Sequence, residues 1–331
     1  MAESVLVAGA SGFAGALAAR LIERHPRFEL AAVTSRSDTG VPLSELYPHH
    51  RVDRELEELD VEGRHGDVDA AIVAYPHGAS APVVAALRER GVKVVDLSAD
   101  FRLNDLAVYE QYYVEHPHPE LIGEAVYGLP ELYRDQLRAA SLVAGPGCYP
   151  TAAILTLAPL ARAGIVRDIV IDAKSGVSGA GRGATQKTHF VTVDENVTPY
   201  GVGTHRHAPE IDQELRALGA AVTATFTPHL LPLDQGELVS CYVTTDEDPG
   251  DVVALYEEAY AGEPFVEVVA RPPGVRDVRD TNICRIHVEI DPRTGKVLAF
   301  GAIDNLWKGT ASQAVQSLNL MFDRDETEGL L

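Results

Sequence analysis

Short apolar runs alternate with amphipathic stretches along the first half of the chain. Runs rich in β-branched residues cover 4–9, 28–35, 69–75, 91–98 and 141–145, and each predicts a short strand. A helix is expected from the first run to about His25, and the segment 79–91 shows the clearest helical pattern. Because strands and helices alternate in this order, we expect parallel βαβ units in a doubly wound α/β sheet.

The pattern changes after residue 150. The runs 167–176, 220–232, 237–246 and 284–291 are long and strand-like, with few helices between them, which predicts an α+β domain with a largely antiparallel sheet. The segment 310–322 places apolar residues at helical spacing, and Thr310 with Gln313 fits a capping box. We expect this helix to pack back on the first domain. The predicted domains are therefore 1–150 with 309–331, and 151–308.

Composition narrows the class of protein. A length of 331 residues fits two domains. The 28 basic and 49 acidic residues give a net charge of −21, which argues against nucleic-acid partners and anionic membranes. The sequence has no run of about 18 apolar residues and no basic signal-peptide flank. Three cysteines favour a reducing compartment over a disulfide framework, so we expect a cytoplasmic protein.

One cysteine lies in an unusual setting, the stretch GPGCYPT at 145–151. Gly and Pro permit a tight turn before it, Pro150 suits the first position of a helix, and the following residues are helix formers up to Gly164. Cys148 is therefore expected at a helix N-terminus, where the helix dipole stabilises a thiolate. A small buried residue beside a turn is the alternative interpretation.

A glycine-rich loop, GASGFAG at 9–15, follows the first strand. Gly9, Gly12 and Gly15 depart from the G-x-G-x-x-G spacing, but they serve the same ends: a tight turn, close approach of a pyrophosphate, and close helix packing. This position predicts a Rossmann-type dinucleotide site.

The end of the second strand indicates which dinucleotide binds. It reads TSRSDTG at 34–40, and it offers Ser35, Arg36 and Ser37 where an NAD site usually shows Asp or Glu. These groups suit a 2′-phosphate, so NADP is predicted. Asp38 leaves two other arrangements open, a pair with Arg36 or a contact with the ribose.

The stretch THRHAPEI at 204–211 precedes a predicted helix with Pro209 in its first turn and Gly219 at its end. In an extended segment His205 and His207 would point to one side and Arg206 to the other. A Cys-His catalytic pair, a metal site and surface polar residues are all compatible with this pattern. No nearby residue completes a metal-ligand spacing, so no metal is predicted.

A nucleophilic cysteine, a histidine and a dinucleotide fold together favour covalent reduction of an acyl phosphate. A thiolate displaces phosphate to give a thioester, hydride transfer gives a thiohemiacetal, and collapse to the aldehyde requires proton transfer.

The sequence also resembles the family of N-acetyl-γ-glutamyl-phosphate reductases in its longer bacterial form. The resemblance covers nearly the whole chain, and its motifs are GASGFAG (9–15), PHG (76–78), VDLSADFR (95–102), YGLPELYR (127–134), GPGCYPTA (145–152), KSGVSGAGR (174–182), HRHAPEI (205–211) and AIDNLWKGTASQAVQ (302–316). The family is similar to aspartate-semialdehyde dehydrogenase, and this implies a Rossmann domain and a catalytic α+β domain that also makes subunit contacts.

The resemblance assigns roles to residues by motif. It implies Cys148 as the nucleophile, His205 as the acid/base, with His207 the alternative, and Glu210 as a residue that orients the histidine. The implied substrate-binding residues are Arg102, Lys174, Arg182 and His207. Arg102 also fits a structural salt bridge, and Lys174 and Arg182 also fit a role in shaping the pocket. For Lys308, which is implied to bind the cofactor, a solvated lysine is the alternative. The implied cofactor-binding residues are Gly9, Ser11, Gly12, Phe13, Gly15, Ser35, Arg36, Ser37, Pro76, His77, Asn305 and Lys308.

The expected activity is NADPH-dependent reduction of N-acetyl-γ-glutamyl phosphate in arginine biosynthesis, by a homodimer or homotetramer. Two alternatives are a lysine-pathway reductase that acts on a carrier-linked aminoadipyl phosphate, and an NADP-binding regulator without turnover. The residues Tyr149, Pro150 and Thr151 and the KSGVSGAGR loop favour the arginine enzyme over the first alternative. An intact Cys148 and His205 argue against the second.

Overall fold

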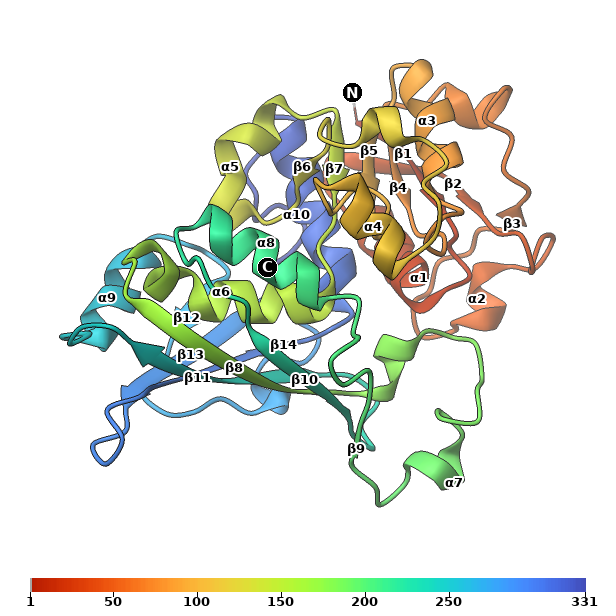
Figure 1. Ribbon diagram of the computed structural model, residues 1–331. Helices are drawn as coiled ribbons and strands as arrows, with labels where there is room; N and C mark the ends of the chain where they lie inside the picture. The colour runs from red at the N-terminus through yellow and green to blue at the C-terminus, as the bar shows by residue number, and fades with distance from the viewer. Residues whose placement is uncertain (1) are drawn as a thin grey trace. The chain divides into compact units, whose positions relative to one another are not determined.

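The computed structural model describes residues 2–331, which form two compact units. Unit 1 comprises the residues up to Gly147 together with Thr310–Leu331, and unit 2 is Cys148–Gly309. Figure 1 labels their elements.

Unit 1 is built on a seven-stranded sheet in the order β3-β2-β1-β4-β5-β7-β6, in which every pair is parallel. This confirms the predicted Rossmann-type α/β fold. Its elements in chain order are β1 (Glu3–Ala8), α1 (Phe13–Glu23), β2 (Phe28–Thr34), α2 (Leu43–Leu46), β3 (Leu56–Glu57), η1 (Arg64–Gly66), β4 (Ala70–Val73), α3 (Ala81–Glu89), β5 (Lys93–Asp96), α4 (Leu106–Tyr112), η2 (Pro119–Leu121), β6 (Val126–Tyr127), α5 (Pro130–Ala139), β7 (Leu142–Ala144) and α10 (Ser312–Met321).

The sheet of unit 1 is covered by helices that its own sequence supplies. The chain runs outward from β1 to β2 through α1, and in the opposite direction from β4 to β5 through α3, so right-handed crossovers place these two helices on opposite faces. The C-terminal helix α10 packs against α1, α5 and β5. The central strands β1 and β4 are buried, as in any sheet covered on both faces.

Unit 2 contains a seven-stranded mixed sheet in the order β12-β13-β14-β11-β8-β10-β9. The pairs β10·β8 and β12·β13 are parallel and the others are antiparallel, which confirms the predicted α+β class. Its elements are α6 (Cys148–Arg162), β8 (Val166–Ser175), η3 (Val177–Ala180), α7 (Phe190–Val193), β9 (Thr198–Pro199), α8 (Ala208–Ala217), β10 (Thr225–Leu230), β11 (Glu237–Thr245), α9 (Val252–Ala259), β12 (Val266–Val268), η4 (Val275–Asp277), β13 (Cys284–Ile290) and β14 (Val297–Ile303). The π-helical turn η5 (Trp307–Ala311) spans the end of unit 2 and the return to unit 1.

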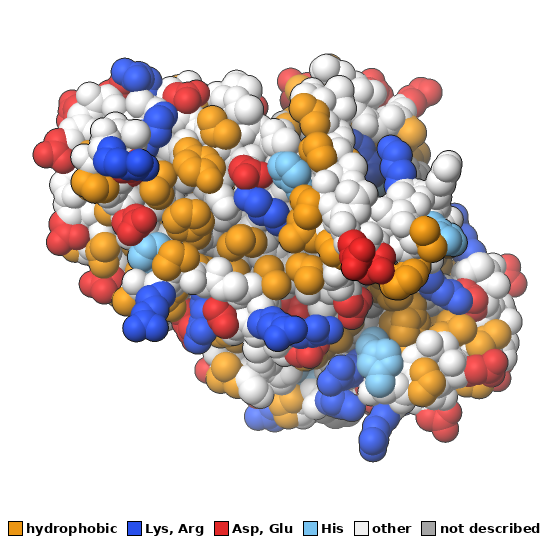
Figure 2. All heavy atoms as spheres, turned by 90° about the horizontal axis from the view of Figure 1, so that it is seen from below, with side chains coloured by type: hydrophobic (Ala, Val, Ile, Leu, Met, Phe, Trp, Pro, Cys, Tyr) orange, Lys and Arg blue, Asp and Glu red, His pale blue; other side chains and the backbone are white. Residues whose placement is uncertain are grey.

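Helices cover one face of this sheet, and within residues 2–331 no helix covers the other (Figure 1). Helix α6 lies on β11, β14 and β8 and contacts α8 and α9 (Figure 1). Side chains alternate accordingly: Ile169, Ile171 and Ala173 of β8 are fully buried, whereas Val170 between them is 36% exposed. The uncovered face is seen from below in Figure 2, where hydrophobic side chains gather among charged ones.

Two local predictions were wrong. The helix after the cysteine begins at Cys148 itself, so Pro150 occupies its third position rather than its first. Thr310 is not the N-cap of α10 as the predicted capping box requires, because α10 continues directly from the π-helical turn η5 and its N-cap is Ala311. Within residues 2–331, no helix combines the length and apolar character needed to cross a membrane.

Candidate active site

The glycine loop of unit 1 forms a close-fitting turn between β1 and α1. Gly9 has a φ of +87°, and a Cβ on it would lie 2.7 Å from the carbonyl oxygen of Ala74. A Cβ on Gly15 would lie 2.3 Å from the carbonyl oxygen of Gly9. Gly12 is the N-cap of α1 and provides no side chain there, so the first-turn N–H groups face outward as in a phosphate-binding loop. Only glycines fit this cradle at Gly9 and Gly15.

The end of β2 lies beside this loop. The hydroxyls of Ser11 and Ser35 are 2.9 Å apart, and Ser35 Oγ also accepts hydrogen bonds from the backbone N–H groups of Ser37 (3.3 Å) and Asp38 (3.2 Å). The Ser37 hydroxyl donates to the Asp38 carboxylate at 2.5 Å. Ser35 is buried, and its hydrogen bonds organise the turn. Phe13 is the first residue of α1, the helix that follows the glycine loop.

A pocket of about 410 Å³ opens at this turn. The Arg36 guanidinium lies over the Tyr75 ring, 4.7 Å from its centre. Arginine stacked in this way presents its edge to an anion, as a 2′-phosphate requires. The sequence analysis identified Arg36 but missed Tyr75, although Tyr75 follows β4, next to β1, at the edge of the sheet where cofactors bind. The pocket is lined by Ser35, Arg36, Thr39, Glu58, Leu59 and Tyr75.

The PHG turn is ordered by a carboxylate that the sequence analysis did not single out. Asp100 is fully buried and accepts hydrogen bonds from the backbone N–H groups of Gly78 (2.7 Å) and Ala81 (2.9 Å). His77 Nδ1 accepts from the N–H of Ala99 at 2.9 Å. Asp100 and His77 therefore join the turn after Pro76 to the loop after β5.

Arg102 contacts the backbone. Its Nε donates to the carbonyl oxygen of Gly145 at 2.6 Å and its Nη2 to that of Leu97 at 2.8 Å, and the side chain is buried. These bonds hold the Gly-Pro-Gly turn just before Cys148. These two bonds support a positioning role for Arg102 more directly than contact with phosphate.

Cys148 is the first residue of α6 and is partly exposed, whereas Cys241 and Cys284 are buried in strands. The sulfur therefore lies where free N–H groups and the helix dipole stabilise negative charge. Gly309 lies against it, since a Cβ on Gly309 would be 2.9 Å from Cys148 Cβ.

Aromatic and imidazole rings form a cluster next to the nucleophile. The His205 ring centre lies 5.8 Å from that of Tyr149, 5.4 Å from Tyr200, 5.3 Å from Phe226 and 4.9 Å from His207. The Tyr200 hydroxyl donates to that of Tyr149 at 3.1 Å. Burial raises the pKa of both tyrosines above the usual range, so both remain neutral.

His205 is held in one tautomer when it is neutral. The backbone N–H of His207 donates to His205 Nδ1 at 3.1 Å, so Nδ1 is unprotonated and Nε2 carries the proton. Burial, with a smaller contribution from Arg206, lowers the pKa of His205 to about 4. His205 is therefore a neutral hydrogen-bond donor through Nε2 at physiological pH.

Glu210 and His207 belong to the first turn of α8. His207 is the N-cap residue, and Glu210 is buried one turn later, with 1% exposure. The two histidine rings do lie together and Arg206 is exposed, as predicted, but the chain achieves this through a turn instead of an extended segment.

A second acidic residue near the nucleophile was missed. Glu237, the first residue of β11, is fully buried, and the Cys148 thiol and the Ser175 hydroxyl lie close enough to its carboxyl to affect its pKa. Burial raises its pKa to about 8. The sequence carries no local sign of this placement.

Lys174 lies on the opposite side of the sheet from these groups. Its Nζ is 2.7 Å from the Asp172 carboxylate and donates to Ser240 Oγ at 3.2 Å, and His229 Nδ1 is 3.1 Å from the same carboxylate. Because side chains alternate along β8, Lys174 faces away from Ser175 and Glu237. Lys174 and Cys148 therefore do not lie on the same face of the sheet. The contact of Lys174 with substrate stays a prediction, and the bonds of Lys174 to Asp172 and Ser240 do not support it.

Asn305 and Lys308 are both buried in unit 2. Asn305 Oδ1 accepts from the N–H of Gly236 at 2.7 Å, and its Nδ2 donates to Ser178 Oγ at 3.0 Å. It thus joins the KSGVSGAGR loop to the start of β11. The Lys308 ammonium lies 5.5 Å from the centre of the Phe265 ring. Their predicted contact with the cofactor is not tested by these bonds.

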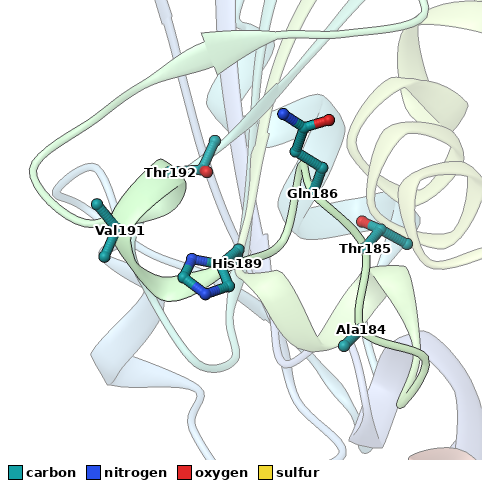
Figure 3. Close-up of a pocket in the computed structure, with 6 residues that line it drawn as sticks. All are labelled: Ala184, Thr185, Gln186, His189, Val191 and Thr192. Atoms are coloured by element: carbon teal, nitrogen blue, oxygen red, sulfur yellow. The ribbon is translucent and has the colours of Figure 1, made fainter.

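Arg182 is exposed and follows η3, at the start of a segment that bears a pocket in unit 2. This pocket, of about 550 Å³, is shown in Figure 3. Its lining includes one imidazole and two threonine hydroxyls but no thiol or carboxylate, so it lacks the chemistry gathered at Cys148. Its lining residues are Ala184, Thr185, Gln186, His189, Val191 and Thr192.

Comparison with known proteins agrees with both units. Residues 4–140 match the family described as "Semialdehyde dehydrogenase, NAD binding domain", and residues 148–305 match "Semialdehyde dehydrogenase, dimerisation domain". Among solved structures, aspartate semialdehyde dehydrogenase II of Vibrio cholerae superposes with a TM-score of 0.75 at 18% identity, over 98% of this chain and 99% of that one. Aspartate semialdehyde dehydrogenase with NADP from Candida albicans gives a TM-score of 0.73 at 14% identity, over 97% and 99%.

Curated relatives are much closer in sequence. The N-acetyl-gamma-glutamyl-phosphate reductase of Desulforudis audaxviator is 49% identical over 98% of this chain and 97% of its own length. The proteins of the same name from Moorella thermoacetica and Rubrobacter xylanophilus are 47% and 48% identical, covering 98% and 100% of this chain and 96% and 99% of their own lengths. The chain belongs to the N-acetyl-γ-glutamyl-phosphate reductase family.

Proposed function

We propose that this chain reduces N-acetyl-γ-glutamyl phosphate to N-acetylglutamate semialdehyde with NADPH, in arginine biosynthesis. The observation that carries the proposal is the position of Cys148, partly exposed at the start of α6 and beside the His205 cluster. The names of relatives that match almost the full chain support the substrate.

The residues of unit 1 fit NADP. The glycine loop offers N–H groups at the start of α1, and the positions of Gly9 and Gly15 leave no room for a Cβ, as close approach of a pyrophosphate requires. Ser35, Arg36 and Thr39 line the adjacent pocket and suit a 2′-phosphate. When bound, NADPH supplies the hydride that reduces the acyl group.

The remaining chemistry belongs to the residues of unit 2. The Cys148 thiolate attacks the acyl carbon, a C–S bond forms, and phosphate leaves with the electron pair of the broken C–O bond. His205 Nε2–H is suited to donate a hydrogen bond to the carbonyl oxygen, where negative charge develops. After reduction, this oxyanion re-forms the carbonyl group and expels the sulfur as a thiolate, which releases the aldehyde. His205 thus acts as a hydrogen-bond donor to the developing oxyanion. Glu210 and the backbone N–H of His207 orient its ring.

The reverse reaction tests the proposal. Purified protein is given N-acetylglutamate semialdehyde, phosphate and NADP, and NADPH absorbance is followed. We expect phosphate-dependent reduction of NADP. A lysine-pathway enzyme would instead use the carrier-linked aminoadipate semialdehyde with comparable efficiency and show little activity with N-acetylglutamate semialdehyde. A regulator would bind NADP and turn over neither aldehyde.

We further propose a cytoplasmic homodimer or homotetramer. The family description of residues 148–305 as a dimerisation domain supports this, as does the uncovered face of the unit 2 sheet, where Val170 and Tyr242 are 36% and 37% exposed (Figure 2). Light scattering of the purified chain measures the mass directly. A monomer at micromolar concentration would contradict the proposed assembly.

A further inference from the structure

Glu237 occupies a position in the sheet that usually holds an apolar residue. It pairs with Ser175 of β8 and with Ile303 of β14. Because side chains alternate along a strand, Glu237 shares a face with Val239 and Cys241, which are 0% and 1% exposed and lie under α6. A carboxyl group is therefore placed in the hydrophobic layer between the sheet and the helix that begins at the nucleophile.

This carboxyl has unused hydrogen-bonding capacity. Among residues 2–331, neither of its two oxygens, both buried, has a partner at standard hydrogen-bond geometry. An unsatisfied buried polar group is costly, and in a folded protein it calls for an explanation, of which a catalytic role is one. The Cys148 thiol and the Ser175 hydroxyl lie close enough to act on the carboxyl as hydrogen-bonding groups.

The surrounding charges favour a protonated carboxyl. Burial is the main cause that raises the pKa of Glu237 to about 8, and the Asp304 carboxylate adds to it, while Cys148 and Ser175 lower the pKa in part. Tyr149 and Tyr200 also face Glu237 and Cys148 and are neutral. In the part of the chain that the structure describes, no cation is among the groups that act on this carboxyl.

We propose that Glu237 and Cys148 form a pair that holds one proton in the reactive enzyme, with the proton on the carboxyl and a hydrogen bond from the carboxyl to the thiolate. In this arrangement Glu237 is a catalytic residue, because its carboxyl donates directly to the reacting sulfur. The inference rests on the proposed role of Cys148 as nucleophile.

The proton balance of this pair is simple. The proton moves from Sγ to a carboxylate oxygen, so the pair has a net charge of −1 both before and after the transfer. No counter-ion is therefore needed to form the thiolate. When the sulfur attacks the acyl carbon, the carboxyl keeps its proton. When the aldehyde is released, the C–S electron pair returns to sulfur, and the hydrogen bond from the carboxyl stabilises the departing thiolate. The carboxyl is unchanged after one turnover.

Alkylation of Cys148 by iodoacetamide tests the pair without substrate or cofactor, because only the thiolate reacts. The rate is measured against pH, and the modified cysteine is identified by mass spectrometry. Cys241 and Cys284 are buried and serve as internal references. A failure of the proposed function would appear in the turnover assay and leave this titration interpretable, so the two failures are distinguishable.

Two substitutions separate hydrogen bonding from packing. Glu237→Leu fills the same space and removes the donor. Because a hydrogen bond to a charged group is lost, alkylation at neutral pH should fall by roughly 10- to 100-fold. Glu237→Gln keeps an N–H donor, so its rate should fall less. Asp212→Asn is the matched control, since Asp212 is another buried acid of unit 2 with a raised pKa. The rate of Cys148 alkylation against pH in this variant should match that of the wild type.

Infrared spectroscopy observes the proton directly. At a pH where Cys148 is alkylated, the difference spectrum between the wild-type chain and Glu237→Gln should contain the C=O band of a protonated carboxyl. The absence of this band would overturn the proposal, whatever the variants show. So would a Glu237→Leu rate equal to or above the wild-type rate, because the carboxyl would then be indifferent to the thiolate or opposed to it.

Discussion

Substitution of Gly309 by alanine is expected to displace the nucleophile by a distance that the structure allows us to estimate. A Cβ at this position would lie 2.9 Å from Cys148 Cβ and 3.3 Å from both Cys148 Cα and the carbonyl oxygen of Asp304. Carbon atoms are in favourable contact at about 3.5–4.0 Å, so the two Cβ atoms must separate by roughly 0.6–1.1 Å. The backbone at Gly309 does not have a positive φ, so alanine is otherwise acceptable there.

This displacement acts on the reacting sulfur. A misplacement of about 1 Å in a catalytic group costs roughly 100-fold in rate, and overpacking costs about 1–3 kcal/mol of stability. We therefore expect kcat of Gly309→Ala to fall by roughly 10- to 100-fold in the phosphate-dependent reverse assay. The NADP affinity should hold, because the glycine loop and the Arg36 pocket belong to unit 1.

Gly274→Ala is the matched control. Gly274 is exposed in the same unit, and a Cβ there would meet only the Asp277 carboxylate at 3.8 Å, an ordinary contact. This variant should retain wild-type kcat and stability. A kcat for Gly309→Ala within twofold of the control would refute the argument that Gly309 fixes the position of Cys148.

Further substitutions test three proposed roles. Cys148→Ala should abolish turnover by several orders of magnitude and leave NADP binding intact, whereas Cys241→Ser should remain active; a tenth of the wild-type rate in Cys148→Ala would contradict covalent catalysis. Arg36→Ala should lower the preference for NADP over NAD by about tenfold or more in kcat/KM, and an unchanged ratio would place the 2′-phosphate elsewhere. Because the pKa of His205 is lowered to about 4, its ring is neutral from about pH 5 upward: His205→Asn should reduce kcat by roughly 10²- to 10⁴-fold without moving an acid limb near pH 6.5. An equal loss in His207→Asn with retention in His205→Asn would assign the donor to His207.

Parts of this site were predictable because their signals are local. The glycines around Cys148 and the helix formers after it lie in one stretch of sequence, so the helix N-terminus followed from residue types alone. The turn after β2 is equally local, and its serines and arginine lie where the sequence placed them. The π-helical turn before α10 has no such signal, and there the capping-box prediction failed.

Other features depend on which strands pair and which face the helices cover. Alternation shows that Lys174 and Ser175 point to opposite faces of β8, but only the placement of α6 shows which face is the interior. In sequence, Glu237 resembles an ordinary strand-edge acid after a glycine. Its burial arises from pairing with β8 and β14, so periodicity along the chain could not reveal it. Strands β3, β6 and β9 have two residues each, too few to show any period.

The contact between Gly309 and Cys148 also affects how the chain folds. These residues are the two ends of unit 2, so once that unit has folded, the ends it returns to unit 1 are adjacent. Docking α10 on α1, α5 and β5 then closes a connection of a few residues instead of one of roughly 160, which saves about 3–4 kcal/mol of loop-closure entropy. Helix α10 belongs to unit 1, but part of its stability therefore depends on the folding of unit 2. Substitutions that unfold unit 2 should destabilise the docking of α10 before they destabilise the rest of unit 1.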